Sequence, residues 1–351
     1  MMKRRTFLTA CGATVLSARS LLAATGATRA KLGICTFSCH QQWRASRDKS
    51  VECSFDDGPS FYAYARKLGA DGTQVSVASL DEAQARAFRA VVAETGGYYE
   101  ADVRLPKKES ELGRFEQDVK LARAAGATVA RSVLSGTRRY ETWKTLEEFQ
   151  TFRAEASQRL AMVEPVLKRH GLKLAIENHK DLTADEQVAL MREFDSEWIG
   201  INVDTGNNLA LLEDPKVTTE ALAPYALSVH LKDMALQPDP DGFQLSEVPC
   251  GTGFLDLPWI VKTLTQANPE LAINLEMATR DPLRIPCLTE GYWATFPDRK
   301  ASHLEKAMAR VQENPPSQPP PSVTGKSTTE IIHDEEANNR NSLIWMHQQL
   351  A

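Results

Sequence analysis

Four short hydrophobic segments in the second half of the chain each end on a residue that can bind a metal ion. These end residues are two glutamates, one aspartate and one histidine, namely Glu177, Asp204, His230 and Glu276. Carboxylates with a single imidazole form an oxygen-rich set that suits Mn²⁺, Mg²⁺ or Co²⁺ and leaves coordination positions open for substrate oxygens. A structural zinc ion would usually take cysteine ligands. The sequence therefore predicts one catalytic divalent ion, with Mn²⁺ expected first.

The same four segments alternate between bulky apolar residues and small or polar ones. In 172–177, the leucines and the isoleucine share one parity, whereas Ala175 and Glu177 share the other. Successive side chains of a strand face opposite sides, so each segment predicts a strand with one apolar face and a metal-type residue at its carboxyl end. The rule also holds in the other three segments, 199–204, 227–230 and 271–276. Functional groups at the carboxyl ends of strands are typical of a (β/α) barrel.

The first half of the chain supplies the remaining strands of such a barrel. We expect these at 31–37, 72–77, 98–105 and 128–134. Helices are predicted between the strands, at 61–68, 81–94, 110–125, 145–170, 184–194, 215–223, 257–267 and 300–313. Regular strand–helix alternation indicates parallel βαβ units. An open, doubly wound sheet would spread the four ligands along a line, whereas a closed barrel brings them to one point. The predicted fold is therefore α/β, a (β/α)8 TIM barrel over residues 31–313.

The N-terminus indicates export. Residues 3–8 read Lys-Arg-Arg-Thr-Phe-Leu, which matches the twin-arginine pattern, and a weakly hydrophobic run follows to about Ala24. We expect residues 1–30 to be an export signal and the mature protein to be periplasmic or otherwise exported. The alternative is a merely basic, amphipathic start. No later stretch is apolar for long enough to cross a membrane, so no membrane contact is expected after the signal is removed.

The C-terminal part differs in composition from the barrel. Residues 314–330 are rich in proline and predict a stiff linker. Residues 331–351 predict a polar, partly helical tail containing Trp345 and Met346. The tail either docks on the barrel or on a second copy of the chain, or stays loosely ordered. A homo-oligomer is thus left open, while the net charge of −5 argues against a nucleic-acid partner.

Five motifs make the chain similar to a known family over about residues 31–312. The sequence reads AIEN at 175–178, GINVDTG at 200–206, VHLKD at 229–233, GTGFLD at 251–256 and LEM at 275–277. These motifs resemble the sugar phosphate isomerase/epimerase group of xylose isomerase-like barrels, which includes the ketose 3-epimerases. The resemblance implies that all four strand-end residues bind one divalent ion and that Glu177 and Glu276 also transfer protons. Many relatives carry histidine three residues after the metal aspartate, where this chain has Asn207.

Four further residues are candidate substrate contacts. His179 lies two residues beyond Glu177 and on the same face, where it could replace the missing histidine, and Asn207 faces the predicted metal. Lys232 shares the face of His230 and could hold a substrate oxygen, although an ion pair with a carboxylate is equally open. Arg104 is a candidate as well, with an inner-barrel ion pair to Asp102 as the alternative.

The predicted activity is isomerisation or epimerisation of a keto-sugar. A carbonyl and a neighbouring hydroxyl on the metal would stabilise the enediolate that forms when the adjacent C–H loses its proton. Glu177 and Glu276 end strands on opposite sides of the predicted mouth, so one removes the proton and the other returns it on the opposite face. Phosphorylated sugars are mainly cytoplasmic, so an exported enzyme is expected to act on an unphosphorylated sugar or sugar derivative.

Three other activities were weighed against this one. The same proton abstraction could lead to β-elimination, which makes a metal-dependent lyase that cleaves a 3-keto-glycoside the main alternative. An abasic-site endonuclease would need more histidine and carboxylate ligands and a basic DNA-binding face, which an acidic chain does not offer. A sugar-binding barrel without catalysis is disfavoured because both glutamates placed for acid–base work are present.

Overall fold

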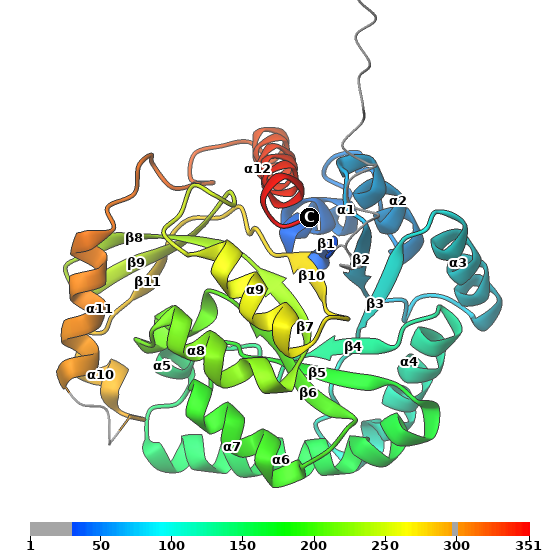
Figure 1. Cartoon of the computed structure of the whole chain (residues 1–351), viewed down its shortest axis with the longest axis horizontal. Helices are drawn as coiled ribbons and strands as arrows, with labels where there is room; N and C mark the ends of the chain where they lie inside the picture. The colour runs from blue at the N-terminus through cyan, green and yellow to red at the C-terminus, as the bar shows by residue number, and fades with distance from the viewer. Residues whose placement is uncertain (1–29, 297–300) are drawn as a thin grey trace, which may run out of the picture.

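A closed barrel of eight parallel strands forms the centre of the protein (Figure 1). The computed structural model describes residues 30–296 and 301–351, so the predicted export signal lies almost wholly outside the described residues. The barrel strands are β1 (Lys31–Cys35), β2 (Gly72–Val75), β3 (Tyr98–Asp102), β4 (Val129–Ser132), β5 (Lys173–Glu177), β6 (Ile199–Asp204), β7 (Ala226–Leu231) and β10 (Ala272–Leu275). Each coincides with a predicted strand, and the predicted TIM barrel is confirmed.

The register of the strands brings the metal-type residues to one level of the barrel. His230 pairs with Asp204 of β6 on one side and with Asn274 of β10 on the other. Glu177 pairs with Asn202, two residues before Asp204. Because carboxyl ends of parallel strands meet at the same rim, these side chains point into a common space.

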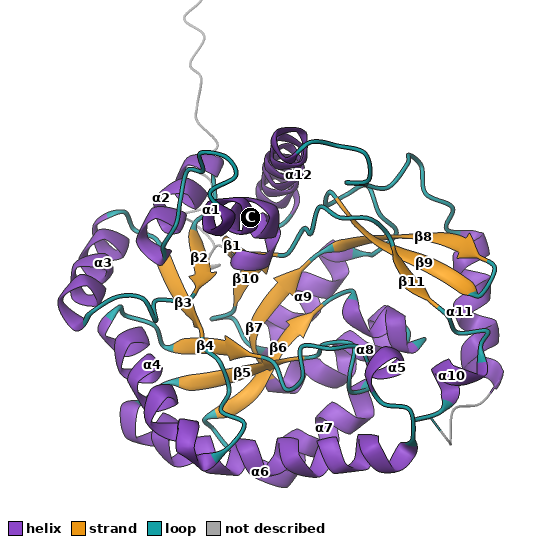
Figure 2. Ribbon diagram, turned by 180° about the vertical axis from the view of Figure 1, so that it is seen from behind, coloured by secondary structure: helices purple, strands orange, loops and turns teal. Residues whose placement is uncertain are grey.

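Helices surround the barrel and bury its apolar outer face (Figure 2). They are α2 (Gly58–Leu68), α3 (Glu82–Glu94), α4 (Leu112–Ala124), α6 (Leu146–His170), α7 (Ala184–Phe194), α8 (Pro215–Leu222), α9 (Leu257–Ala267) and α11 (Ala301–Glu313). Asp57, Asp81, Thr145 and Thr183 begin four of them with capping boxes. Each of these side chains accepts a hydrogen bond from the third helical N–H, which would otherwise lack a partner.

Several elements were not predicted. A 3₁₀ turn (Thr36–Cys39) and helix α1 (His40–Asp48) follow β1 directly. A three-stranded antiparallel sheet has two of its strands in the long interval between His230 and Glu276 and the third after Glu276. It contains β8 (Asp233–Asp239), β9 (Gly242–Val248) and β11 (Leu283–Ile285) and lies beside the barrel mouth (Figure 2). Two short helices, α5 (Arg139–Thr142) and α10 (Glu290–Trp293), complete this rim.

The C-terminal tail is a long helix, α12 (Thr328–Gln349), that lies against α1, β1 and β10 (Figure 1). It begins three residues before the expected start of the tail at residue 331. Its residues Leu343 and Met346 are buried. The carboxylate of Glu335, also in this helix, accepts hydrogen bonds from the backbone N–H groups of Gln41 and Gln42 at 2.8 and 3.0 Å. The tail is therefore docked on the barrel of its own chain.

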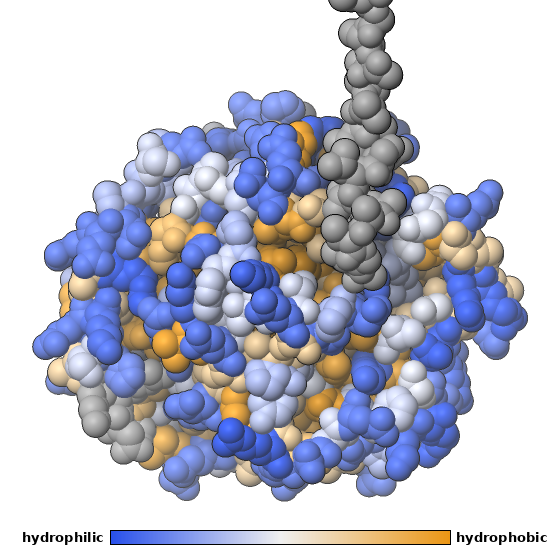
Figure 3. Space-filling model, viewed as in Figure 1, coloured by the Kyte–Doolittle hydropathy of each residue, from blue (hydrophilic) through white to orange (hydrophobic). Residues whose placement is uncertain are grey.

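The outer surface is mostly polar. Figure 3 shows hydrophilic side chains over much of the periphery, with hydrophobic residues in separate patches between them. Within the described part of the chain, no helix has both the length and the apolar character needed to span a membrane.

Candidate metal centre

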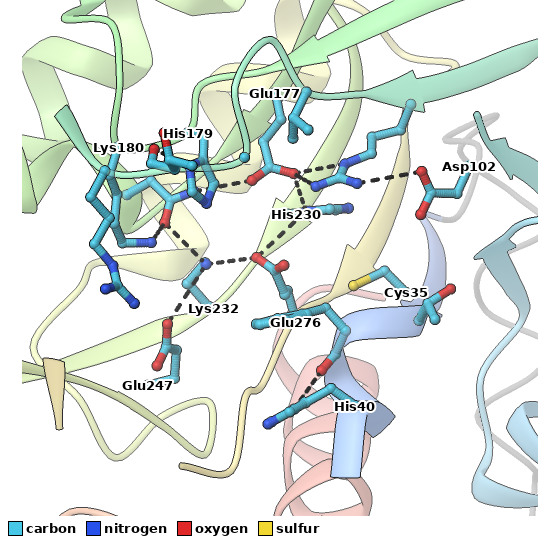
Figure 4. Close-up of a pocket in the computed structure, with 18 of the residues that line it drawn as sticks. Cys35, His40, Asp102, Glu177, His179, Lys180, His230, Lys232, Glu247 and Glu276 are labelled. Atoms are coloured by element: carbon cyan, nitrogen blue, oxygen red, sulfur yellow. Dashed lines mark hydrogen bonds and ion pairs between the residues drawn. The ribbon is translucent and has the colours of Figure 1, made fainter. Parts of the chain in front are cut away.

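The four strand-end residues meet at the mouth of the barrel (Figure 4). Glu177, Asp204, His230 and Glu276 are all buried, and one ligand atom from each lies within 4.8 Å of the others. They come from β5, β6, β7 and the residue after β10. The structure thus brings together the whole metal-ligand set that the sequence predicted.

The orientation of His230 is set by Gln74 on β2. The Gln74 amide nitrogen donates to Glu100 at 3.0 Å and to Ser228 at 3.2 Å, so its oxygen faces His230. His230 Nε2 lies 2.7 Å from that oxygen and can donate to it, which turns Nδ1 towards the carboxylates. A carboxylate or amide partner on the far nitrogen is the usual way in which a metal-binding histidine is oriented.

A cation would fit between the inner nitrogen of His230 and the surrounding carboxylates. His230 Nδ1 lies 3.2 Å from Glu177 Oε2 and 3.5 Å from Glu276 Oε2. Two ligand atoms on neighbouring octahedral positions, each about 2.2 Å from an ion, are about 3.1 Å apart. His230 Nδ1, Asp204 Oδ2 and Glu276 Oε2 are buried without a hydrogen-bond partner among the described residues. This donor set fits a divalent ion.

Two cationic side chains balance the carboxylates from either side. Lys232 Nζ lies 2.8 Å from Asp204 Oδ2 and 2.6 Å from Glu276 Oε2, as ion pairs that lack hydrogen-bond angles. Arg131 donates from Nε to Glu177 Oε2 at 2.8 Å, and a second guanidinium nitrogen contacts the same oxygen. Burial alone would raise the pKa of Glu177, but Arg131 holds it below its ordinary value.

Three of the four predicted substrate contacts face the site. His179 lines the cavity, and its Nδ1 lies 3.1 Å from the Thr137 carbonyl oxygen. Asn207 is buried and donates to Glu177 Oε1 at 3.2 Å, so it holds a metal-ligand carboxylate directly. Lys232 also lines the cavity, although it is engaged with the carboxylates as described above.

Arg104 lies outside the site. Strand β3 ends at Asp102, and Arg104 is exposed and absent from the residues that line the cavity. Asp102 instead lies 3.4 Å from Arg131, so the expected ion pair between Asp102 and Arg104 is not formed. The prediction extended the strand alternation two residues too far, because the chain leaves the barrel wall after Asp102.

Five polar residues of the site were not predicted. They are Glu100, Arg131, Lys180, Glu247 and Arg280. The first two had a signal, since each is a charged residue inside a predicted strand. The others had none, because they lie after strands or in the additional sheet. Glu247 of β9 and Arg280 form an ion pair with an N–O distance of 2.9 Å at the side of the cavity.

The cavity above these residues has a volume of about 630 Å³. Phe37 and His40 stack against each other on one side, with ring centroids 4.9 Å apart, and Trp43 lies further along the same helix. Arg138 and His179 form the opposite side. Space of this size, with polar groups at the base and aromatic rings on a wall, is suited to a small sugar-like molecule.

Known proteins share parts of this architecture and sequence. The xylose isomerase-like TIM barrel family matches residues 62–301. The solved structure of an L-ribulose 3-epimerase superposes with a TM-score of 0.56 at 16% identity, covering 92% of this chain and 94% of that one.

Two curated relatives match shorter stretches. The uncharacterised protein YihM of Escherichia coli strain K12 is 26% identical over 189 residues, which are 54% of this chain and 53% of YihM. The 3-oxo-isoapionate decarboxylase of Pectobacterium atrosepticum is 31% identical over 112 residues, which are 31% of this chain and 41% of the decarboxylase. The chain spans about half the length or less of these two relatives. The family match covers well over half of the chain, and the protein therefore belongs to the xylose isomerase-like TIM barrel family.

Proposed function

We propose that the protein is a divalent-metal-dependent isomerase or epimerase of an unphosphorylated keto-sugar or sugar derivative. The observation that carries the proposal is the pair of buried carboxylates, Glu177 and Glu276, which reach the same space from separate strands with His230 Nδ1 between them. The fold likeness to an L-ribulose 3-epimerase supports the same class of activity. The exported location belongs to this proposal and rests on the N-terminal residues alone.

Four residues would hold the ion: Glu177, Asp204, His230 and Glu276. A divalent ion, of which Mn²⁺ is our first choice, would supply positive charge beside a substrate carbonyl as negative charge develops on its oxygen. Asn207 and Arg131 both hold Glu177 in place, and Gln74 orients His230. A ligand set fixed in this way is ready before the substrate arrives.

Proton transfer would be the task of the two glutamates. Strands β5 and β10 are separated in the barrel by β6 and β7, so Glu177 and Glu276 approach a bound sugar from different directions. One would remove the proton from the carbon next to the carbonyl, and the other would return it on the opposite face. Lys232 lies beside Glu276, where its ammonium group can stabilise an adjacent oxyanion.

The walls of the cavity would keep the intermediate away from water. The 3₁₀ turn and α1 place Phe37 and His40 over the base of the cavity, and the loop after β4 closes the opposite side with Thr137 and Arg138. An enediolate that is shielded from solvent is reprotonated by the enzyme and not by water.

A lyase is the second candidate. The 3-oxo-isoapionate decarboxylase, which is 31% identical to a part of this chain, is named for breaking a bond of an oxo-acid. Decarboxylation and β-elimination both pass through an enolate next to a carbonyl, so the same residues could serve either outcome. In the lyase reaction, the enolate of a 3-keto-glycoside would expel the substituent at its β-carbon.

Hydrogen exchange in D₂O tests the proposal. Proton NMR of the Mg²⁺-loaded protein with a panel of keto-sugars and oxidised glycosides should show loss of the C–H signal next to the carbonyl. The product then separates an epimer from an eliminated fragment. Glu276→Gln should abolish the exchange, whereas Glu270→Gln, an exposed glutamate near the other end of the barrel, should leave it unchanged. A protein that binds metal yet exchanges no substrate proton would refute the proposal.

A further inference from the structure

The ammonium group of Lys180 is buried at the side of the cavity and has no carboxylate partner. Lys180 follows β5 by three residues and is 4% exposed. Its Nζ donates a hydrogen bond to Asn207 Oδ1, and Lys232 Nζ lies 3.4 Å from that same oxygen (Figure 4). Two ammonium groups therefore converge on one neutral amide oxygen.

Three other cations of the cavity are neutralised by carboxylates. Arg131 pairs with Glu177, Lys232 with Glu276, and Arg280 with Glu247. Lys180 forms no ion pair with any of the described residues, because the carboxylates nearest to it are already engaged with Lys232 and Arg280. Burial, with further repulsion from Lys232 and Arg280, lowers the pKa of Lys180 to about 8.

A buried and unpaired ammonium group is unfavourable by itself. Removing a charge from water costs several kcal/mol unless an opposite charge replaces the lost hydration. A divalent ion at the four ligands would increase this imbalance, since Asp204 and Glu276 would then serve the ion as well as Lys232. Lys180 lines the cavity, so an anion supplied by the substrate can reach it.

We propose that Lys180 binds a carboxylate of the substrate, and that the substrate of this site is accordingly a keto-sugar acid. This inference rests on the proposed function and specifies its substrate class. Lys232 and Arg280 are each paired with a carboxylate, so among the described residues Lys180 contributes one unpaired positive charge, which matches a carboxylate monoanion. A phosphate dianion is usually held by several arginines or by backbone N–H groups at a helix N-terminus, and no such arrangement surrounds Lys180 among the described residues.

Three ligands that differ only at carbon 6 test the inference: D-fructose, D-fructuronate and D-fructose 6-phosphate. Calorimetric titration of the Mg²⁺-loaded full chain should give the tightest binding for D-fructuronate, by about 10- to 100-fold over D-fructose, as one charge-assisted hydrogen bond provides. Lys180→Met should remove this preference, because it should weaken the binding of D-fructuronate far more than that of D-fructose. Lys180→Arg, which keeps the charge, should retain part of it.

Any one of three results would overturn the inference. Equal affinity of the wild-type protein for D-fructose and D-fructuronate excludes a carboxylate site, even if Lys180→Met fails to fold. If D-fructose 6-phosphate binds most tightly, the group that the site recognises is a phosphate and not a carboxylate. Equal weakening of all three ligands by Lys180→Met, at unchanged Mg²⁺ content, makes Lys180 a general part of the cavity. The proposed function fails separately, through absence of C–H exchange, which leaves the binding preference unaffected.

Discussion

Gln74 and His230 are 156 positions apart in the sequence, yet a hydrogen bond of 2.7 Å between them decides which imidazole nitrogen faces the carboxylates. Gln74 accepts from Nε2 because its own amide nitrogen is bound to Glu100. The imidazole therefore presents Nδ1 to Glu177 and Glu276. The proposed metal binding would thus depend on a residue of β2 that is not itself a candidate ligand.

Replacing Gln74 should weaken metal binding without removing a ligand. Gln74→Leu keeps the approximate volume but loses the acceptor, so His230 can rotate or change tautomer. We expect the affinity for Mn²⁺ to fall by about 10- to 100-fold, the usual effect of losing such a partner. Competition with a metal-sensitive dye measures the affinity. Ser76→Ala, at an exposed position next to the same strand, is the control, and equal affinities of both variants would contradict the role assigned to Gln74.

Arg131 should be important for the stability of the metal-free protein. Arg131→Met leaves the buried Glu177 carboxylate without its closest cation. Loss of one partner from a buried pair is expected to lower the free energy of unfolding by about 3–5 kcal/mol. Urea denaturation of the metal-free protein measures this difference.

The matched control is Arg138→Met, which breaks a partly exposed pair with Glu141. Exposed pairs contribute at most about 1 kcal/mol, so the control should unfold close to the wild-type midpoint. A similar decrease in the free energy of unfolding of both variants would mean that Arg131 contributes no more to stability than a surface arginine.

The C-terminal helix should contribute to stability through its buried face. Met346 is 0% exposed, whereas Ile344 on the same helix is 49% exposed. Met346→Ala should lower the free energy of unfolding by about 2–5 kcal/mol, and Ile344→Ala should change it by less than about 0.5 kcal/mol. Thermal unfolding followed by circular dichroism distinguishes the two. Indistinguishable midpoints would show that α12 does not stay docked on the barrel in solution.

Glu335 should make the docking of α12 depend on pH. Burial raises the pKa of this carboxyl to about 8 from 4.5, although two backbone N–H groups at the start of α1 oppose the shift. The titratable groups near it include His40, Glu336, Tyr64 and the thiols of Cys39 and Cys53. The folded state then binds the proton more tightly than the unfolded state, so the stabilisation is complete below pH 4.5 and is lost as the pH rises through 8.

For one proton, this linkage limits the change of the free energy of unfolding to about 1.4 kcal/mol per pH unit. Urea midpoints measured between pH 5 and pH 8 should decrease for the wild-type protein and change less for Glu335→Gln. Glu336→Gln, at the neighbouring position, should retain the wild-type slope. Parallel curves for all three proteins would contradict a raised pKa at Glu335.

The sequence predicted the eight strands and the inward parity of their metal-type residues. Alternation in a strand is local, since each side chain faces the opposite side from its neighbour. The parallel arrangement then follows from the helices between the strands, and it places every carboxyl end at one rim. Glu177, Asp204, His230 and Glu276 could therefore be brought together without knowledge of any contact between them.

The additional sheet shows a limit of that reasoning. The long interval before β10 contains Asp241-Gly242 between two alternating segments, which is a common signal for a β-hairpin. Glu247 reaches the cavity only because this hairpin lies over the barrel mouth. The hairpin has its own local signal, but its position relative to the barrel is set by packing between distant segments.

The sequence by itself thus determined the barrel, the four candidate ligands and their common level, because all three follow from local periodicity and strand order. Only the tertiary structure decided the partners of those ligands. Gln74 and Arg131 come from strands that carry no ligand, and Lys180 is left without a carboxylate by pairs formed elsewhere in the cavity. Such relationships depend on how side chains fill a shared interior, and no spacing along the chain encodes them.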